Sequence, residues 1–210
     1  MARFLEILKG RRSIRRYLQQ RVPMEILYRV LEAARWAPSA HNAQPWRFIL
    51  IVDEELKKRL AEAMAEDWIR DLTSNGLPPE EAEKMAEASV TTFTGSSMLI
   101  VACLTMEDMD KYPDKRRMEY EYTMAVQSLA AAIQNMLLAI SSEGLGGCWF
   151  CAPLFCKDTV RRVLGIPGHV EPQALISLGY PAEKRDPPPR RPIHEFSYLN
   201  RWGEEFRSPS

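Results

Sequence analysis

The sequence predicts a single domain in which helices cover a buried sheet. Short apolar runs at residues 47–52, 97–105 and 173–180 are typical of buried strands, because strand-forming residues follow one another without helical spacing. The stretches between them carry apolar residues three and four positions apart, which indicates amphipathic helices. The chain has 210 residues and contains neither a repeat nor a linker, so one core is expected.

The helices and a further short strand follow from local signals. Helices are predicted at residues 4–10, 24–36, 53–71, 80–88, 124–142 and 157–164, and the strand at residues 148–150. Asp53 is expected to cap the third helix. The helix over residues 124–142 is apolar nearly all round, so it must be covered on every side by the core or by a partner subunit.

Two segments fit neither pattern. The segment from about residue 105 to 122 is polar, charged and rich in tyrosine, which suggests a lid or an insertion. Residues 181–192 contain too many prolines for a helix and are expected to run extended along a surface.

Composition excludes several classes of protein. Lys plus Arg and Asp plus Glu balance at 28 each, so no overall field favours nucleic acid or an anionic membrane. Polar residues interrupt the longest apolar stretch, residues 125–140, so we expect a buried helix there and no membrane span. The N-terminal residues lack the apolar core of a signal peptide, and we therefore expect a cytoplasmic protein without nucleic-acid or membrane partners.

The four cysteines raise the question of a metal or redox cluster, because Cys148-x-x-Cys151 is followed by Cys156. A structural zinc site usually has four ligands, and the three histidines lie far away in the sequence. We therefore predict no metal site and expect the cysteines to pack in the core as small apolar residues.

An arginine-rich motif occupies residues 11–17, with four arginines and a serine around Ile14. Guanidinium groups pair bidentately with phosphate or carboxylate, so the motif indicates an anion site. The alternative is a solvated basic turn. Arg190 and Arg191, at the end of the proline-rich segment, form a second candidate anion site.

A loop between Pro38 and Pro45 carries Ser39, His41, Asn42 and Gln44. Proline restricts the backbone, so such a loop can hold hydrogen-bonding groups with little entropy left to lose, which suits recognition of the edge of a planar heterocycle. A rigid helix-to-strand connection is the alternative. The glycines of residues 144–147 lack the order of a dinucleotide fingerprint and suit either a helix cap or a close approach to a ligand.

Together these segments resemble the nitroreductase family of FMN-dependent oxidoreductases. The matching stretches occur in the family's order: residues 11–15, 38–46, 134–135, 144–149, 178–181 and the Arg-Arg-Pro tail. Residues 111–114 with 154–156 look like the FMN-binding domain that is attached to bacterial coenzyme F420 glutamyl ligases. The resemblance implies an α+β fold, an α-β-α sandwich with a mainly antiparallel sheet, in one domain over residues 1–210. It also implies an intertwined homodimer in which the tail, residues 181–210, packs on the partner subunit.

The resemblance assigns FMN-binding positions and no catalytic side chain, because the flavin carries the chemistry. The cofactor-binding residues it implies are Arg11, Arg12, Ser13, Arg15, Pro38, Ser39, Ala40, Asn42, Gln44, Cys151, Ala152, Arg190 and Arg191. The arginine motif and the tail arginines would hold the phosphate and the pyrimidine edge. The loop from Pro38 would come from the opposite subunit, and backbone amides near Cys151 would face flavin N5. The family often has glycine in that last turn, where this chain has Phe150, Cys151 and Ala152.

The expected activity is hydride transfer from NADH or NADPH, or from reduced F420, to a small electron-poor acceptor. Arg15 would supply a fixed cation where reduction leaves negative charge on the flavin. Two alternatives remain open: a flavin- or F420-binding module without turnover, and an enzyme of cofactor biosynthesis without a diffusible nitro or quinone substrate.

Overall fold

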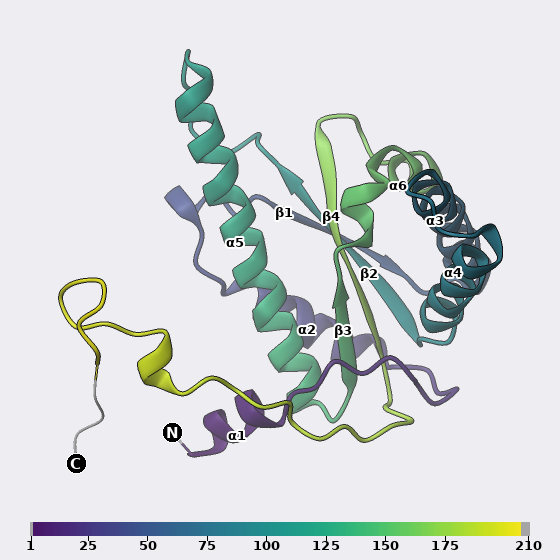
Figure 1. The fold of residues 1–210 in the computed structure, drawn as a ribbon, viewed down its shortest axis with the longest axis horizontal. Helices are drawn as coiled ribbons and strands as arrows, with labels where there is room; N and C mark the ends of the chain where they lie inside the picture. Colours follow the sequence, from purple (N-terminus) through teal and green to yellow (C-terminus); the bar gives the residue numbers. More distant parts are fainter. Residues whose placement is uncertain (1, 207–210) are drawn as a thin grey trace.

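The computed structural model describes residues 2–206 and shows an α-β-α sandwich (Figure 1). Its antiparallel sheet has the strand order β1-β2-β4-β3. The strands are β1 (Trp46–Ile51), β2 (Met98–Thr105), β3 (Gly146–Phe150) and β4 (Val170–Gly179). The helices are α1 (Ala2–Gly10), α2 (Met24–Arg35), α3 (Glu54–Ser74), α4 (Pro79–Thr94), α5 (Lys115–Ser142) and α6 (Lys157–Leu164), with the 3-10 turns η1 (Ala40–Asn42), η2 (Ala152–Phe155) and η3 (Ile193–Glu195). The predicted fold class is confirmed.

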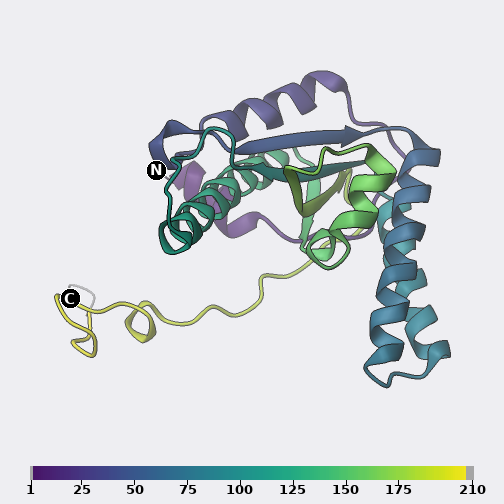
Figure 2. The ribbon, with the colours of Figure 1, turned by 90° about the horizontal axis from the view of Figure 1, so that it is seen from above.

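Both faces of the sheet are covered, which explains why β2 is buried at every position. Ile100 and Ala102 face the core beneath α2 and α5, whereas Leu99 and Val101 face a second core beneath α3, α4 and α6. A strand that is buried on both faces reads as a continuous apolar run, because each alternate side chain enters a core. Figure 2 shows α3 and α4 as a hairpin that projects beyond the sheet.

The long helix α5 begins nine residues before the predicted start at residue 124, so the segment at residues 105–122 is not a separate element. Its later part is the first two turns of α5, which begin where the Asp114 side chain accepts from the N–H of Arg117. These turns extend past the sheet (Figure 1), so their polar composition reflects solvent rather than a break in the helix. By length and composition α5 could cross a membrane, but Ala125, Leu129 and Ile133 on it form the core with the sheet.

Most other boundaries agree within a few residues. The Asp53 cap is confirmed, since its side chain accepts from the N–H of Leu56 at 2.7 Å. Helix α4 continues to Thr94, six residues beyond the predicted end, because Phe93 in its last turn packs in the second core. Gly144 follows α5 with a φ of 73°, so this glycine serves as a helix C-terminal residue, one of the two predicted roles.

Gly146 provides a close approach, but to a protein side chain. A Cβ at this position would lie 2.7 Å from both Cβ and Cγ1 of Ile14. Ile14 is itself buried, and its segment runs along the free edge of β3. The arginine motif is therefore seated on β3 through a contact that only glycine permits.

We predict that Gly146→Ala lowers the free energy of unfolding by about 1–3 kcal/mol, the usual cost of overpacking a well-filled site. Thermal and urea unfolding would measure it. Gly168→Ala is the matched control, because a Cβ there would meet nothing within 4 Å. Equal stability of the two variants would contradict the close packing of Ile14 on β3.

Candidate functional site

The arginine motif lies along the edge of β3 almost as an additional strand. Ser13 pairs with Gly147 in a parallel bridge, and the N–H of Ile14 donates to the carbonyl of Gly147 at 3.2 Å. At the end of the motif the Tyr17 hydroxyl donates to the carbonyl of Ile14 and lies 2.7 Å from the Ser177 hydroxyl. Burial raises the pKa of Tyr17, so this hydroxyl stays protonated. The motif is therefore anchored to the sheet by the buried Ile14 and Tyr17, while Arg15 and Arg16 between them are exposed.

Glu183 holds the arginine motif against the beginning of the tail. Its Oε1 accepts from the backbone N–H of Arg15 at 2.8 Å and lies 3.0 Å from Nε of Arg185. Arg16 lies 3.6 Å from the other oxygen. The hydrogen bond from Arg15 and the charge of Arg185 lower the pKa of Glu183, so the carboxylate is ionised at neutral pH.

A cavity of about 680 Å³ opens beside this carboxylate. Arg15 and Arg16 line it, together with Lys84 from α4 and Arg185 from the tail. Glu87 is the one carboxylate among the lining residues. Four cations against one acid make this cavity complementary to an anion.

The Arg12 side chain turns back toward α1, whereas Arg15 lines the cavity. Its Nη1 donates to the carbonyls of Lys9 and Arg11 at 2.6 and 2.7 Å, so it stabilises the end of α1. Its Nε is buried without a hydrogen-bond partner in the part of the chain that the structure describes. The backbone of Arg11 adds one more helical hydrogen bond at the end of α1, because its N–H donates to the carbonyl of Ile7.

The loop between Pro38 and Pro45 is held in a strained conformation. His41, Asn42 and Gln44 have positive φ values of 55°, 54° and 46°. Such values in non-glycine residues cost about 1–3 kcal/mol each and persist only where contacts enforce them. Here the N–H of Ala40 donates to Ser128 Oγ on α5, and the N–H of Gln44 donates to Ser39 Oγ, each at 3.1 Å.

The strained loop and the arginine motif do not meet within one chain. His41, Asn42 and Gln44 line a cavity of about 560 Å³ that shares no residue with the cation-lined cavity. In Figure 1 the loop lies beside the upper half of α5, whereas the arginine motif runs past its lower end. Ser39 and Asn42 can therefore join the arginine motif only across two subunits, and that arrangement stays a prediction.

The turn after β3 does approach the arginine motif. The guanidinium carbon of Arg15 lies 5.8 Å from the centre of the Phe150 ring. Phe150, Cys151 and Ala152 border a cavity of about 780 Å³ that the α3–α4 hairpin covers. Its walls are largely apolar, with Met64, Trp68, Leu72, Phe93 and Phe155 among them. The turn that was expected to face flavin N5 thus lies next to Arg15.

The tail does not bring Arg190 and Arg191 to the cation-lined cavity. After Glu183 and Arg185 the chain runs extended and leaves the body of the subunit (Figure 2). Both arginines are exposed, and neither has a hydrogen bond or ion pair with another residue of the range 2–206.

One of the four cysteines departs from the expectation that they pack in the core. Cys103, Cys148 and Cys156 are buried, and burial raises the pKa of Cys103 and of Cys156 to about 12. Cys151 is exposed in the turn after β3. The expectation was wrong for Cys151 because β3 ends at Phe150, and the following residue no longer enters either core.

Sequence reasoning missed Glu183, Arg185 and Lys84. Lys84 and Arg185 occur in strongly charged stretches that look like ordinary surface, and the contact of Glu183 with Arg15 spans 168 positions. The available signal was weak: Glu183 and Arg185 directly follow the Gly-Tyr-Pro segment that matched the family pattern.

We predict that Glu183→Gln loosens the arginine motif. The variant keeps an acceptor for Arg15 but loses the charge that attracts Arg16 and Arg185, at a cost of about 1 kcal/mol. Hydrogen exchange at the Arg15 amide would measure the change, with Glu143→Gln as the control, because its carboxylate pairs with the distant Arg29 at 2.7 Å.

In the wild type, the protection of the Arg15 amide from hydrogen exchange should depend on pH. The pKa of Glu183 is lowered below 4.5 in the folded state, so its stabilisation is complete above the ordinary carboxyl range and disappears as pH falls through the lowered value. Protection of the Arg15 amide that did not change between neutral and acidic pH would contradict the role of Glu183.

Comparison with known proteins shows the family and the fold of the chain. The family model described as "Nitroreductase family" matches residues 8–180. A protein of Archaeoglobus fulgidus, provisionally named NADH dehydrogenase/NAD(P)H nitroreductase, is 31% identical over 190 residues, which cover 89% of this chain and 90% of that protein. The crystal structure of a protein with the same provisional name from Parabacteroides distasonis has a TM-score of 0.70 at 27% identity, covering 95% of this chain and 99% of that chain.

A further structure shows the fold alone: the BluB-like flavoprotein from Clostridium difficile has a TM-score of 0.78 at 22% identity and covers 94% of this chain and 98% of its own. The family match extends from the end of α1 to the residue after β4 and includes the arginine motif and the strained loop. This chain belongs to the nitroreductase family.

Proposed function

We propose that this protein, a flavin-dependent oxidoreductase of the nitroreductase family, binds FMN beside Arg15 and passes hydride from NADH or NADPH to a small electron-poor acceptor. The observation that carries the proposal is the meeting of Arg15, the cation-lined cavity and the turn at Phe150–Ala152 in one subunit. The named relative from Archaeoglobus fulgidus supports the nicotinamide donor.

The residues present fit the charges of FMN. The phosphate is a dianion and needs more than one cation, which Arg15, Arg16, Lys84 and Arg185 can supply from three separate elements. Glu183 and Glu87 do not neutralise them fully, because two carboxylates carry two negative charges against four positive ones. The cavity therefore retains the positive charge that an anionic cofactor needs.

FMN, when bound, supplies the N5 atom that accepts and returns hydride. The chain's own contribution is electrostatic and steric. Arg15 offers a positive charge beside the ring of Phe150, which favours the negative charge that reduction leaves on the pyrimidine edge. Phe150 and Ala152 add apolar surface on the neighbouring side.

The apolar cavity under the α3–α4 hairpin is our candidate for the acceptor site. It borders Phe150, Cys151 and Ala152, and its aromatic walls suit a flat, apolar, electron-poor molecule. Asp67 and Asp71 at its rim disfavour strongly anionic acceptors.

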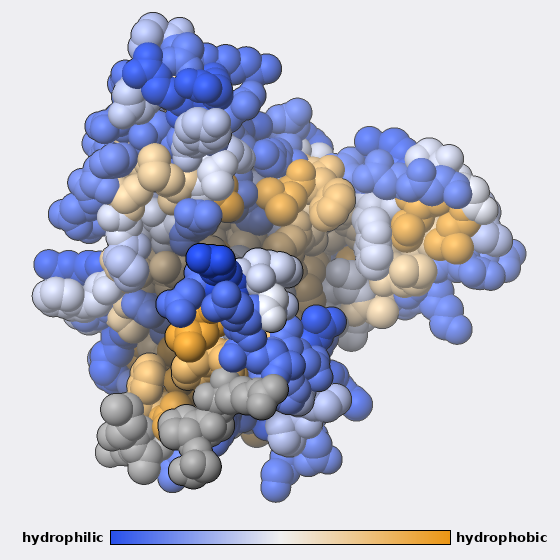
Figure 3. Space-filling view, turned by 60° about the vertical axis from the view of Figure 1, so that its left-hand side comes forward, coloured by the Kyte–Doolittle hydropathy of each residue, from blue (hydrophilic) through white to orange (hydrophobic). Residues whose placement is uncertain are grey.

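We further propose that the active form is a homodimer. The tail projects from the body with large apolar side chains in the open, among them Ile193, Phe196 and Trp202, the last of which is 88% exposed. Figure 3 shows apolar surface on the face from which the tail extends, in the hollow behind it. Exposed apolar area on this scale is typical of a surface that another chain covers. A partner would also bring its strained loop to the arginine motif.

The first test is the visible spectrum of the purified protein, repeated without oxygen after NADH, NADPH or reduced F420 is added. We expect flavin bands that one of the nicotinamides bleaches and a quinone or nitroaromatic acceptor restores. Arg15→Ala should retain at least tenfold less FMN, because it removes a cation from the site. Arg29→Ala is the control, since Arg29 pairs with Glu143 away from the cavity.

Each result decides a part of the proposal. A colourless protein that FMN cannot reconstitute would overturn it, and full FMN content in Arg15→Ala would refute the role of Arg15. Flavin bands that no donor bleaches would favour a binding module, and bleaching by reduced F420 alone would replace the nicotinamide donor.

A truncation can test the role of the tail without removing the Glu183 contact. Removal of residues 187–210 keeps Glu183 and Arg185 but deletes Arg190, Arg191 and the exposed apolar side chains. We expect this variant to become monomeric at micromolar concentration in analytical ultracentrifugation and to lose most of its FMN. A stable dimer with full flavin content would refute the assignment of the tail to the partner subunit.

A further inference from the structure

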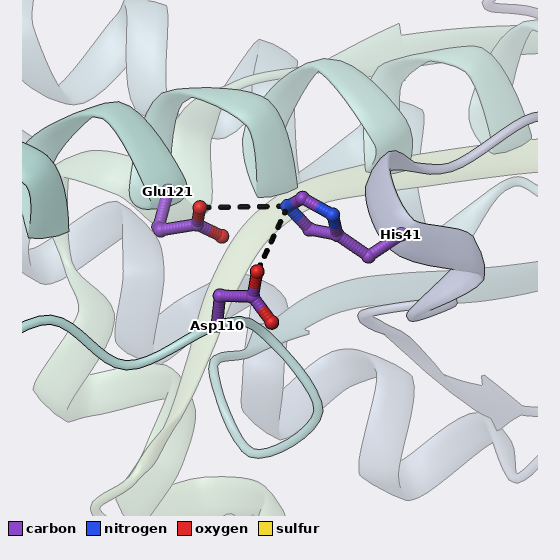
Figure 4. A group of neighbouring side chains, drawn as sticks. All are labelled: His41, Asp110 and Glu121. Carbon is purple, nitrogen blue, oxygen red and sulfur yellow. Dashed lines mark ion pairs between the residues drawn. The ribbon is translucent and has the colours of Figure 1, made fainter.

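The histidine of the strained loop lies close to two carboxylates, outside the cation-lined cavity. His41 comes from the loop, Asp110 from the turn before α5, and Glu121 from the second turn of α5. Nε2 of His41 lies 3.4 Å from Oε1 of Glu121 and 3.8 Å from Oδ2 of Asp110. Figure 4 shows the imidazole and both carboxylates turned toward one another.

Glu121 is the unusual member of this group. It is only 2% exposed, and its Oε2 has no hydrogen-bond partner among the residues that the structure describes. Burying an unpaired carboxylate is costly, and such a group is normally balanced by a cation and hydrogen bonds. His41 is the one ion-pair partner recorded for Glu121 within residues 2–206, and it contacts only Oε1.

We propose that His41, Asp110 and Glu121 form a binding site for one divalent transition-metal ion of the zinc class. Imidazole with two carboxylates is a donor set that such ions accept. Ligand bonds of about 2.1 Å in tetrahedral geometry place neighbouring donor atoms about 3.4 Å apart. The two distances from His41 are close to this value, and the three donor atoms all lie within 4.8 Å of one another.

The surroundings suit a metal ion. His41 and Asp110 are partly exposed, so an ion and a water molecule that completes its coordination can enter from solvent, whereas Glu121 closes the site from the core. The ion would satisfy the charge of Glu121, which no lysine or arginine of the described chain contacts within ion-pair distance. The expectation of no metal site was based on the cysteines. It did not consider His41, Asp110 and Glu121 together, because only the fold brings them close.

A metal here would brace the strained loop. His41 has a φ of 55°, and coordination of its side chain would tie the loop to α5 and to the turn before it. Through Ser39 and Asn42, which share this loop, the metal would also stabilise the partner's flavin site. That consequence rests on the proposed function, whereas metal binding itself does not.

The test uses equilibrium dialysis of the purified holoprotein against Zn²⁺, after treatment with EDTA, with elemental analysis of the bound metal. We expect about one Zn²⁺ per chain in the wild type and at least a tenfold loss of affinity in His41→Gln and Glu121→Gln. Asp110→Asn, at the exposed side, should lose less. Glu121→Gln preserves shape, and circular dichroism would confirm its folding.

Two matched controls exclude binding at other surface groups. His169→Gln removes a histidine whose Nε2 lies 3.1 Å from Glu107, a similar pair that lacks a buried carboxylate. Cys151→Ser removes the exposed thiol. Both should bind zinc like the wild type, and a control that loses as much as Glu121→Gln would overturn the proposal, as would wild type without stoichiometric zinc.

Thermal unfolding provides a second readout that does not depend on flavin. Zn²⁺ should raise the unfolding temperature of the wild type and leave that of Glu121→Gln unchanged, because only the folded wild type offers the complete site. Without zinc, Glu121→Gln should be at least as stable as the wild type, since it removes the uncompensated buried charge. A variant that is clearly less stable without metal would show that the carboxylate is satisfied by the protein alone and would refute the site.

Discussion

The contact of Ile14 with Gly146 is the constraint on which the arginine site depends. It brings the backbone of the arginine motif against β3, and Tyr17 continues the attachment to β4 through Ser177. Arg15 and Arg16 follow this attachment directly in the chain and line the cavity. The same segment covers the free edge of β3, so one contact both protects the sheet and positions the cations.

The tail depends on this attachment as well. Glu183 connects Arg185 to the backbone of Arg15, and the N–H of Ala182 donates to the carbonyl of Arg16 at 2.9 Å. These contacts fix the direction in which the chain leaves the body (Figure 2). The exposed apolar side chains beyond residue 192 lie further along the tail that begins at this attachment.

The sequence predicted the sheet, the core helices and the extended run of residues 181–192, because apolar periodicity and turn residues act locally. It predicted α5 only in its apolar part, since the helix extends beyond the core through residues that resemble a loop in composition. Lys84, Glu183 and Arg185 could not be predicted: their role depends on contacts between segments distant in the chain, and charged residues of this kind usually lie in solvent. The proximity of His41, Asp110 and Glu121 could not be predicted for the same reason.

Strain in the loop from Pro38 to Pro45 supports a site that is ordered before any ligand arrives. Three non-glycine residues with positive φ would relax in a free loop, so other interactions must offset their cost. The hydrogen bonds to Ser128 and Ser39 hold the backbone on either side of His41. They do not involve the His41 side chain. That side chain, although 41% exposed, lies 3.4 Å from a buried carboxylate, which joins the loop to the helix that also forms the core. A loop fixed at both its backbone and its side chain loses little entropy on binding, and this favours recognition of a rigid planar ligand by Ser39 and Asn42.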